Sequence, residues 1–119
     1  MFIECCKSKI GHATITESEL LYEGSITIDE DILKSVDIIA GQCVDVLNIN
    51  NGNRFKTYVI SGEPGSGKIC LNGPAARQGL VGDQIIIVSY AFMSVDEAKA
   101  FKPKIVHLDE SNKIKNTDR

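Results

Sequence analysis

The sequence predicts a small, mainly β fold, a mixed barrel with short helices. Three observations favour this class: many short segments alternate apolar and polar residues, three stretches carry helix-start signals, and the sequence has no strand–helix–strand repeat. At 119 residues the chain is long enough for one hydrophobic core, so we expect a single domain over 1–119. The hydrophobic content of 43% and the charged content of 24% are typical of a globular protein in water.

The first third of the chain predicts two strands and two short helices. Residues 7–15 alternate loosely and are expected to form the opening strand. Thr16–Glu19 has the S/T-x-x-E pattern of a capping box, which predicts a helical turn through Leu21. Ile residues alternate in 26–28, a brief strand. The acids that open 29–36 favour a second short helix, because they interact well with its positive end.

The middle of the chain predicts a hairpin followed by a short strand. Strands at 43–49 and 54–60 flank the sequence Asn-Asn-Gly-Asn at 50–53, which predicts a tight turn because Asn and Gly tolerate positive φ. A strand at 68–71 then ends in a turn at 72–74, where Gly and Pro interrupt the pattern.

The last third predicts a central strand, a helix and a final strand. Residues 84–90 form the most apolar segment and are therefore expected inside the sheet. A second capping box at Ser94–Glu97 opens a helix that must end before Pro103. A final strand is expected at 105–108, and the polar tail from Ser111 is expected to be frayed.

Composition excludes several functional classes. A net charge of −3 and a pI of about 5.3 argue against a nucleic-acid-binding surface. No apolar run reaches the roughly 20 residues that cross a bilayer. The first residues lack the basic and apolar blocks of a signal peptide, so we expect a cytoplasmic protein.

The cysteines are expected to be buried, reduced thiols. The chain has four of them, without a C-x-x-C pair, and two histidines whose spacing matches no familiar zinc pattern. Neither a disulfide framework nor a metal site is therefore predicted; the residues concerned are Cys5, Cys6, Cys43, Cys70, His12 and His107.

One motif resembles a phosphate-binding loop but lacks its essential parts. Gly62–Lys68 fits G-x-x-x-x-G-K, yet Ile69 stands where a Ser or Thr would hold magnesium. The loop should also open a helix, whereas 69–71 is β-prone. We therefore expect an ordinary hairpin loop and no nucleotide site.

The chain is organised around the Gly24–Ser25 bond, where a turn leads into a short strand. A bare Gly-Ser pair is usually structural, but its setting here is informative. With Lys9 upstream and the runs 51–58 (Asn-Gly-Asn-Arg-Phe-Lys-Thr-Tyr) and 72–77 (Asn-Gly-Pro-Ala-Ala-Arg) downstream, the chain resembles the bacterial aspartate 1-decarboxylase family. The resemblance extends from about Lys9 to about Pro103. It implies a six-stranded double-psi β-barrel, a homotetramer, and conversion of L-aspartate to β-alanine and CO₂ for pantothenate biosynthesis.

The resemblance also implies a cofactor made from the chain itself. Decarboxylation of an amino acid leaves a carbanion that needs an electron sink, which no ordinary side chain supplies. In the family, the serine at the position of Ser25 attacks the carbonyl of Gly24, and the chain is cut into 1–24 and 25–119 with a pyruvoyl group at residue 25. Substrate then forms a Schiff base with that ketone, so neither pyridoxal phosphate nor a metal is expected.

Four further side chains are candidates for the substrate site. Arg54 and Tyr58 lie four residues apart on one predicted strand and therefore share a face. A guanidinium can bind a carboxylate through two parallel hydrogen bonds, and a tyrosine can supply a proton. The resemblance gives Arg54 and Lys9 substrate binding, Tyr58 proton donation, and Thr57 roles in processing and substrate binding. Strand parity points Thr57 away from Arg54, which a bulge, a backbone contact or a site between subunits would reconcile.

The remaining candidates come from the resemblance, with two departures. Substrate contacts are expected from Gly73, Pro74 and Ala75, and support from Tyr22 and Asn72. Pro74 replaces the alanine that is common in the family and removes one backbone donor. Gly11 stands where a histidine is usual, so His12 has no assigned role.

Two other readings remain open at this point. In one, the chain is a non-catalytic β-barrel binding module and the Gly24–Ser25 bond stays intact. In the other, 62–68 binds a nucleotide. Chain cleavage separates the decarboxylase from both.

Overall fold

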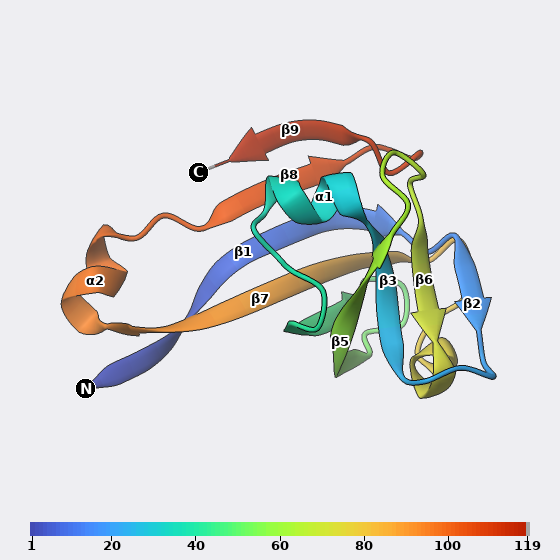
Figure 1. The fold of residues 1–119 in the computed structure, drawn as a ribbon, viewed down its shortest axis with the longest axis horizontal. Helices are drawn as coiled ribbons and strands as arrows, with labels where there is room; N and C mark the ends of the chain where they lie inside the picture. The colour runs from blue at the N-terminus through green and yellow to red at the C-terminus, as the bar shows by residue number, and fades with distance from the viewer. Residues whose placement is uncertain (119) are drawn as a thin grey trace.

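The computed structural model describes residues 1–118 and confirms the predicted mainly β class (Figure 1). Nine strands and a few short helices follow one another in the order β1 Phe2–Thr14, β2 Glu17–Glu19, β3 Ser25–Asp29, α1 Glu30–Ser35, β4 Cys43–Asn48, β5 Arg54–Gly62, β6 Ile69–Asn72, the 3₁₀ helix η1 Gly73–Arg77, β7 Gln84–Ser94, α2 Val95–Ala100, β8 Lys104–Leu108 and β9 Ile114–Asp118. The strand count is three more than the six that the resemblance implies for the double-psi barrel. Neither α-helix in the described chain is long and apolar enough to cross a membrane.

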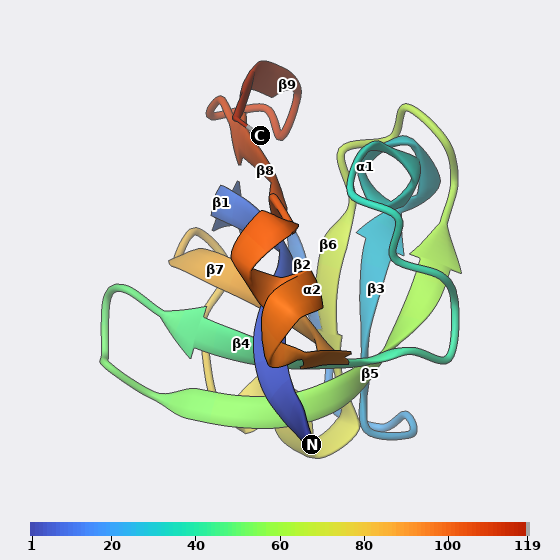
Figure 2. The same ribbon diagram turned by 90° about the vertical axis from the view of Figure 1, so that its left-hand side faces the viewer.

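All nine strands of the described chain belong to one mixed sheet in the order β2-β6-β3-β5-β4-β7-β1-β8-β9. The predicted apolar strand β7 lies between β4 and β1, inside the sheet. It pairs with β1 from Phe2 opposite Ser94 to Thr14 opposite Gln84. These two strands form the long axis of the molecule, with α2 at the far end (Figure 1). In Figure 2, β3 and β6 stand beside β5 on one side, and the β4–β5 hairpin extends to the other.

Asn112, in the turn between β8 and β9, connects that turn to the end of β1 and to the loop that leads into β6. Asn112 is buried with φ of 59°, and its side chain donates to the carbonyls of Gly67 at 2.8 Å and Thr14 at 2.9 Å. Its Oδ1 accepts from the Thr14 amide at 2.8 Å. The prediction of a frayed tail from Ser111 is therefore wrong, and β9 pairs with β8 beyond it. The tail is polar, so its order comes from these backbone contacts, which hydrophobic periodicity does not report.

The barrel core is aliphatic. Ile26 and Ile28 of β3 share one buried face, as the alternation in 26–28 predicts, and they stand opposite Leu71 and Ile69 of β6. Together with the other fully buried branched side chains they supply the main stabilising term, roughly 1.5–3 kcal/mol for each large side chain. The largest are Ile10, Ile15, Ile26, Ile28, Ile32, Leu33, Ile69, Leu71, Ile85, Ile87, Val36 and Val44.

The helix predicted from Thr16 to Leu21 is absent, and its residues form β2 instead. The Thr16 hydroxyl donates to the carbonyl of Ile69 at 3.1 Å and accepts from the same residue's amide at 3.0 Å. In a capping box, that hydroxyl accepts a hydrogen bond from the backbone amide three residues later. Here the neighbouring strand occupies it, and β2 runs parallel to β6.

The thiols are free, but they are not uniformly buried as predicted. Cys70 is buried, Cys5 and Cys6 are half-buried, and Cys43 is exposed. Cys43 opens β4 on its outward face, opposite Tyr58, which accounts for its exposure.

The glycine-rich loop at 62–68 runs into β6, as predicted, and encloses a carboxylate of its own chain. The amides of Gly65 and Gly67 donate to the two oxygens of Asp29 at 3.0 and 2.8 Å. Asp29 also accepts from the Asp31 amide at 2.8 Å and so caps α1. Burial raises the pKa of Asp29, but these amides, with Lys113 nearby, outweigh burial and lower it overall. The donors that would hold a phosphate are thus already occupied.

We predict that Asp29→Asn destabilises the fold by about 1–3 kcal/mol at pH 7, because an amide nitrogen would face the Gly67 amide. Since folding lowers the pKa of Asp29, its carboxylate stabilises the fold above the unfolded-state pKa near 3.9, and this stabilisation is lost as the pH falls through the folded-state value. Urea unfolding at pH 7 and at pH 3 should therefore show a smaller gap between variant and wild type at the lower pH. Glu110→Gln, at an exposed position, is the control. A gap that does not change with pH would contradict this role.

Candidate active site

Ser25 is fully buried at the start of β3, with its hydroxyl held on both sides. Its Oγ donates to the carbonyl of Glu23 at 3.1 Å and accepts from the Asn72 side-chain amide at 3.0 Å. Asn72 stands directly opposite Ser25 in the antiparallel β3–β6 pair. Pairing of the two strands therefore fixes the hydroxyl next to the Gly24–Ser25 bond, and Asn72, predicted only as support, contacts the candidate nucleophile directly.

Gly73 explains how the end of β6 can lie so near this bond. It has φ of 63°, a region that favours glycine. A Cβ atom at this position would lie 2.9 Å from the Glu23 carbonyl carbon and 2.9 Å from the Gly24 nitrogen, and would collide with the Tyr22 carbonyl oxygen. The backbone of β6 can therefore pack against residues 22–24 only with glycine at 73.

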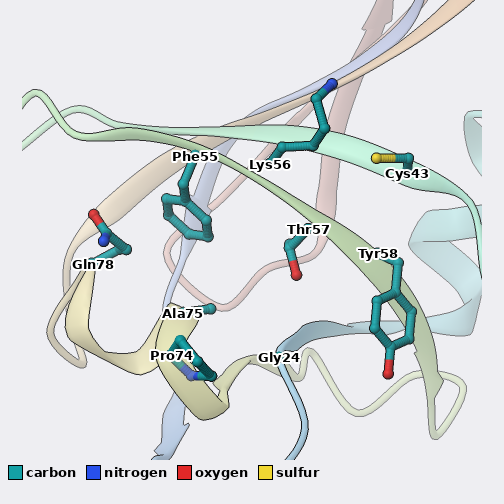
Figure 3. A pocket seen from close by; sticks show the side chains of 9 residues that line it. All are labelled: Gly24, Cys43, Phe55, Lys56, Thr57, Tyr58, Pro74, Ala75 and Gln78. Carbon is teal, nitrogen blue, oxygen red and sulfur yellow. The ribbon is translucent and has the colours of Figure 1, made fainter.

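A cavity of about 470 Å³ opens beside Gly24 (Figure 3). In Figure 3, Thr57 points from β5 toward Gly24, Tyr58 lies at the edge of the cavity with its ring turned the same way, and Lys56 extends in the opposite direction. The wall opposite β5 comes from η1, where Pro74 and Ala75 sit next to Gly24. The lining residues are Gly24, Cys43, Phe55, Lys56, Thr57, Tyr58, Pro74, Ala75 and Gln78.

Arg54 is held elsewhere, by a charged cluster on the outer face of the sheet. Its guanidinium donates to Asp45 at 3.1 Å and to the Tyr90 hydroxyl at 2.9 Å, and Tyr90 donates to Asp45 at 3.0 Å. Lys56 also lies 3.4 Å from Asp45. Burial raises the pKa of Asp45, but the hydrogen bonds from Tyr90, Lys56 and Arg54 outweigh burial and lower this pKa overall. The carboxylate therefore stays charged. Burial and Asp45 raise the pKa of Tyr90, which keeps its proton.

Lys9 lies on the same sheet face. It pairs with Val88 of β7, which in turn pairs with Asp45 of β4, so the three form one row across the sheet. Arg54 and Lys9, both within the described chain, are outside the set of residues that line the cavity at Gly24. The parity expected on β5 is present, because exposure alternates from Arg54 to Tyr58 with Thr57 half-buried. Within this chain, therefore, Gly24, Thr57 and Tyr58 line the cavity, whereas Arg54 and Lys9 do not.

Tyr22 and His12, both considered in the sequence, are not among the residues that line the cavity at Gly24. Tyr22 is exposed and lines a second, polar cavity of about 590 Å³, on which Asn72 also borders. His12 is exposed with φ of 58°, and its ring centroid lies 5.9 Å from that of His107. A Cβ on Gly11 would lie 2.7 Å from the His107 ring, which explains why glycine precedes His12 here.

Sequence reasoning missed the residues that orient the candidates. Asp45 could have been found, because counting back from the 50–53 turn places it opposite Lys56. Tyr90 comes from β7, and no local pattern connects it with Arg54. Thr27 and Cys70 hydrogen-bond the Asn72 side chain, and strand pairing likewise brings them to it.

Comparison with known proteins identifies a family. A family model described as aspartate decarboxylase matches residues 1–115. The aspartate 1-decarboxylase of Acetivibrio thermocellus is 59% identical over 116 residues, which cover 98% of this chain and 92% of that protein. Proteins of the same name from Caldicellulosiruptor bescii and Parabacteroides distasonis are 57% and 56% identical, cover 96% of this chain, and are themselves covered to 89% and 99%. Among solved structures, the rationally designed protein mkDPBB_sym_86 aligns with a TM-score of 0.49 at 14% identity, over 65% of this chain and 90% of its own.

We predict that Gly73→Ala destabilises the fold far more than Gly52→Ala. Both glycines have positive φ, so each alanine brings a backbone cost of roughly 1–2 kcal/mol. Gly52 has open space around its missing Cβ, whereas alanine at 73 must displace residues 22–24, at about 1–3 kcal/mol more. Urea unfolding of the two variants measures the difference. Equal losses would mean that the backbone at 22–24 moves aside without cost.

Proposed function

The chain belongs to the aspartate decarboxylase family, and on that premise we propose that it is a self-processing, pyruvoyl-dependent enzyme that converts L-aspartate to β-alanine and CO₂. The observation that carries the proposal is the buried Ser25 hydroxyl, held by Glu23 and Asn72 next to the Gly24 carbonyl and beside a cavity. β-Alanine formed in this way would supply pantothenate biosynthesis. The free thiols are suited to a reducing compartment, which supports a cytoplasmic enzyme.

Maturation begins with an acyl shift at the Gly24–Ser25 bond. Ser25 Oγ adds to the Gly24 carbonyl carbon, the C–N bond to residue 25 breaks, and an ester and a free amine replace the amide. Loss of the Ser25 Cα proton expels the Gly24 carboxylate and leaves dehydroalanine. Water then displaces ammonia from the imine tautomer, which gives a pyruvoyl group at the head of 25–119. Thr57, whose side chain points toward Gly24 in Figure 3, is the candidate to polarise the scissile carbonyl.

The surroundings of residue 25 fit a pyruvoyl group at that position. Residue 25 is the first residue of β3, and the cavity beside Gly24 is large enough for a four-carbon amino acid. The pyruvoyl ketone supplies the electron sink for decarboxylation, so pyridoxal phosphate and a metal are not needed. Tyr58, at the cavity edge, donates the proton that replaces CO₂. The backbone of Gly73 and Ala75 contacts the substrate, and Pro74 packs against Gly24 where an amide donor would otherwise stand.

Arg54 and Lys9 bind the substrate carboxylates, and they reach the site from a neighbouring copy of the chain. In one protomer they lie outside the cavity at Gly24. Large apolar side chains are also exposed, among them Leu21, Ile39, Phe92 and Leu80, which is the kind of surface that a second copy covers. We therefore propose a homotetramer with each site shared between two protomers. The alternative, a non-catalytic binding module, is disfavoured by the match to the aspartate decarboxylase family over residues 1–115.

Cleavage is the first test of this proposal. Purified wild-type protein should contain two fragments that end and begin at residues 24 and 25, and Ser25→Ala should stay one chain without activity, because it has no nucleophile. Intact-mass analysis and a β-alanine assay measure both. Lys68→Ala, in the glycine-rich loop, should retain near wild-type cleavage and activity. An intact wild-type chain that nevertheless produces β-alanine would rule out the mechanism.

Complementation tests the shared site. Ser25→Ala keeps Arg54 but lacks the pyruvoyl group, and Arg54→Ala is expected to have the pyruvoyl group but no guanidinium. If one site draws on two protomers, co-expression of the two inactive variants should restore activity, in about one quarter of the sites by random pairing. Ser25→Ala co-expressed with the double variant should stay inactive. Failure of the first mixture, with mixed oligomers demonstrated by mass, would place Arg54 and residue 25 in one protomer.

A further inference from the structure

One face of the β3–β6 pair carries a hydrogen-bond network around Asn72, beside the second cavity. Ser25 is opposite Asn72 and Thr27 is opposite Cys70, so alternate pairs bring all four side chains to one face. The Asn72 amide nitrogen donates to Ser25 Oγ at 3.0 Å and to Thr27 Oγ1 at 2.9 Å. Its Oδ1 accepts from the Cys70 thiol, with a sulfur–oxygen distance of 3.2 Å. The Ser25 hydroxyl proton goes to the Glu23 carbonyl.

The Cys70 thiol decides which way the Asn72 amide faces. In the orientation above, both amide hydrogens have oxygen acceptors and Oδ1 has a donor. If Cys70 could not donate, Oδ1 would be buried without its thiol partner, at a cost. Rotation of the amide by 180° would then let the hydroxyls of Ser25 and Thr27 donate to Oδ1. The thiol therefore favours the orientation in which Ser25 Oγ accepts a hydrogen bond.

Cys70 is able to act as this donor because it keeps its proton. Its side chain is buried, and burial, with the nearby carboxylate of Glu17, raises the pKa of the thiol. The neutral S–H is a weak donor with two acceptors in reach: Asn72 Oδ1 at 3.2 Å from the sulfur, and the Leu71 carbonyl at the longer distance of 3.9 Å.

We propose that Cys70 is a positioning residue for self-processing: it fixes the Asn72 amide so that Nδ2 donates to Ser25 Oγ. The inference rests on the proposed function. A donor aimed at Oγ stabilises the negative charge that develops there as the hydroxyl proton leaves, and it leaves the other lone pair for the Gly24 carbonyl. With the amide reversed, the Ser25 proton turns to Oδ1, and Oγ loses that donor. Cys70 thus acts on the reaction through Asn72 without touching the reacting atoms.

The test is the rate at which newly made precursor is cut. Labelled chain from cell-free translation is sampled over time, and conversion of the 119-residue precursor to the 95-residue fragment is followed by mass. Cys70→Ala should slow cleavage by about threefold to tenfold, the rate equivalent of one neutral hydrogen bond. Cys70→Val, which is larger than alanine but also lacks a donor, should be slowed similarly. Cys70→Ser retains a donor and should restore a rate near that of wild type.

Controls separate donation from packing and from the function itself. Cys5→Ala, at a thiol remote from Asn72 in the fold, should cleave as wild type does, and thermal melts report any general loss of stability. Equal rates for Cys70→Ala and wild type would overturn the inference. So would a rate that follows side-chain volume, with serine as slow as alanine. A wild-type precursor that is never cut would instead overturn the proposed self-processing. That result can be told apart from the one against Cys70, in which wild type and Cys70→Ala are both cut, at equal rates.

Discussion

The candidate site depends on the close approach of Gly73 to the backbone of residues 22–24. Because residue 73 has no Cβ, the end of β6 can lie against the turn that precedes β3. That approach is compatible with the antiparallel register of β3 and β6, in which Asn72 stands opposite Ser25 and Leu71 opposite Ile26. One face of the same ladder is then aliphatic core and the other is the polar network. The packing that stabilises the barrel therefore also orients the Ser25 hydroxyl.

Much of the fold follows from local patterns. Apolar alternation predicted β3, the Asn-Gly turn between two alternating segments predicted the β4–β5 hairpin, the apolar run predicted the central position of β7, and the second capping box predicted α2. The first capping box predicted a helix wrongly, because the Thr16 hydroxyl bonds a strand that lies 53 residues away. The polar strand β9 was missed for a related reason. Its order depends on β8 and on Asn112, and neither contact leaves a hydrophobic period in the sequence.

The candidate site was predictable as a set of residues but not as an arrangement. Strand parity correctly separated Thr57 from Arg54. The family resemblance supplied the other candidates, but no sequence pattern indicates that Arg54 is fixed by Asp45 and Tyr90 on the outer face. That cluster also affects the charge available to a ligand. Asp45 offsets only part of the charge of Arg54, Lys56 and nearby Lys9, so the face keeps an excess of positive charge suited to a dicarboxylate.

The position of β1 determines how a chain cut after residue 24 would behave. β1 lies between β7 and β8, paired with both, and Ile10 and Ala13 are buried in the core. A 24-residue piece that contains this strand cannot leave without opening the middle of the sheet. The cut protein would therefore be a non-covalent complex of two peptides, and its unfolding would become a dissociation. Its apparent melting temperature would then rise with protein concentration, although the fold and its contacts stay the same.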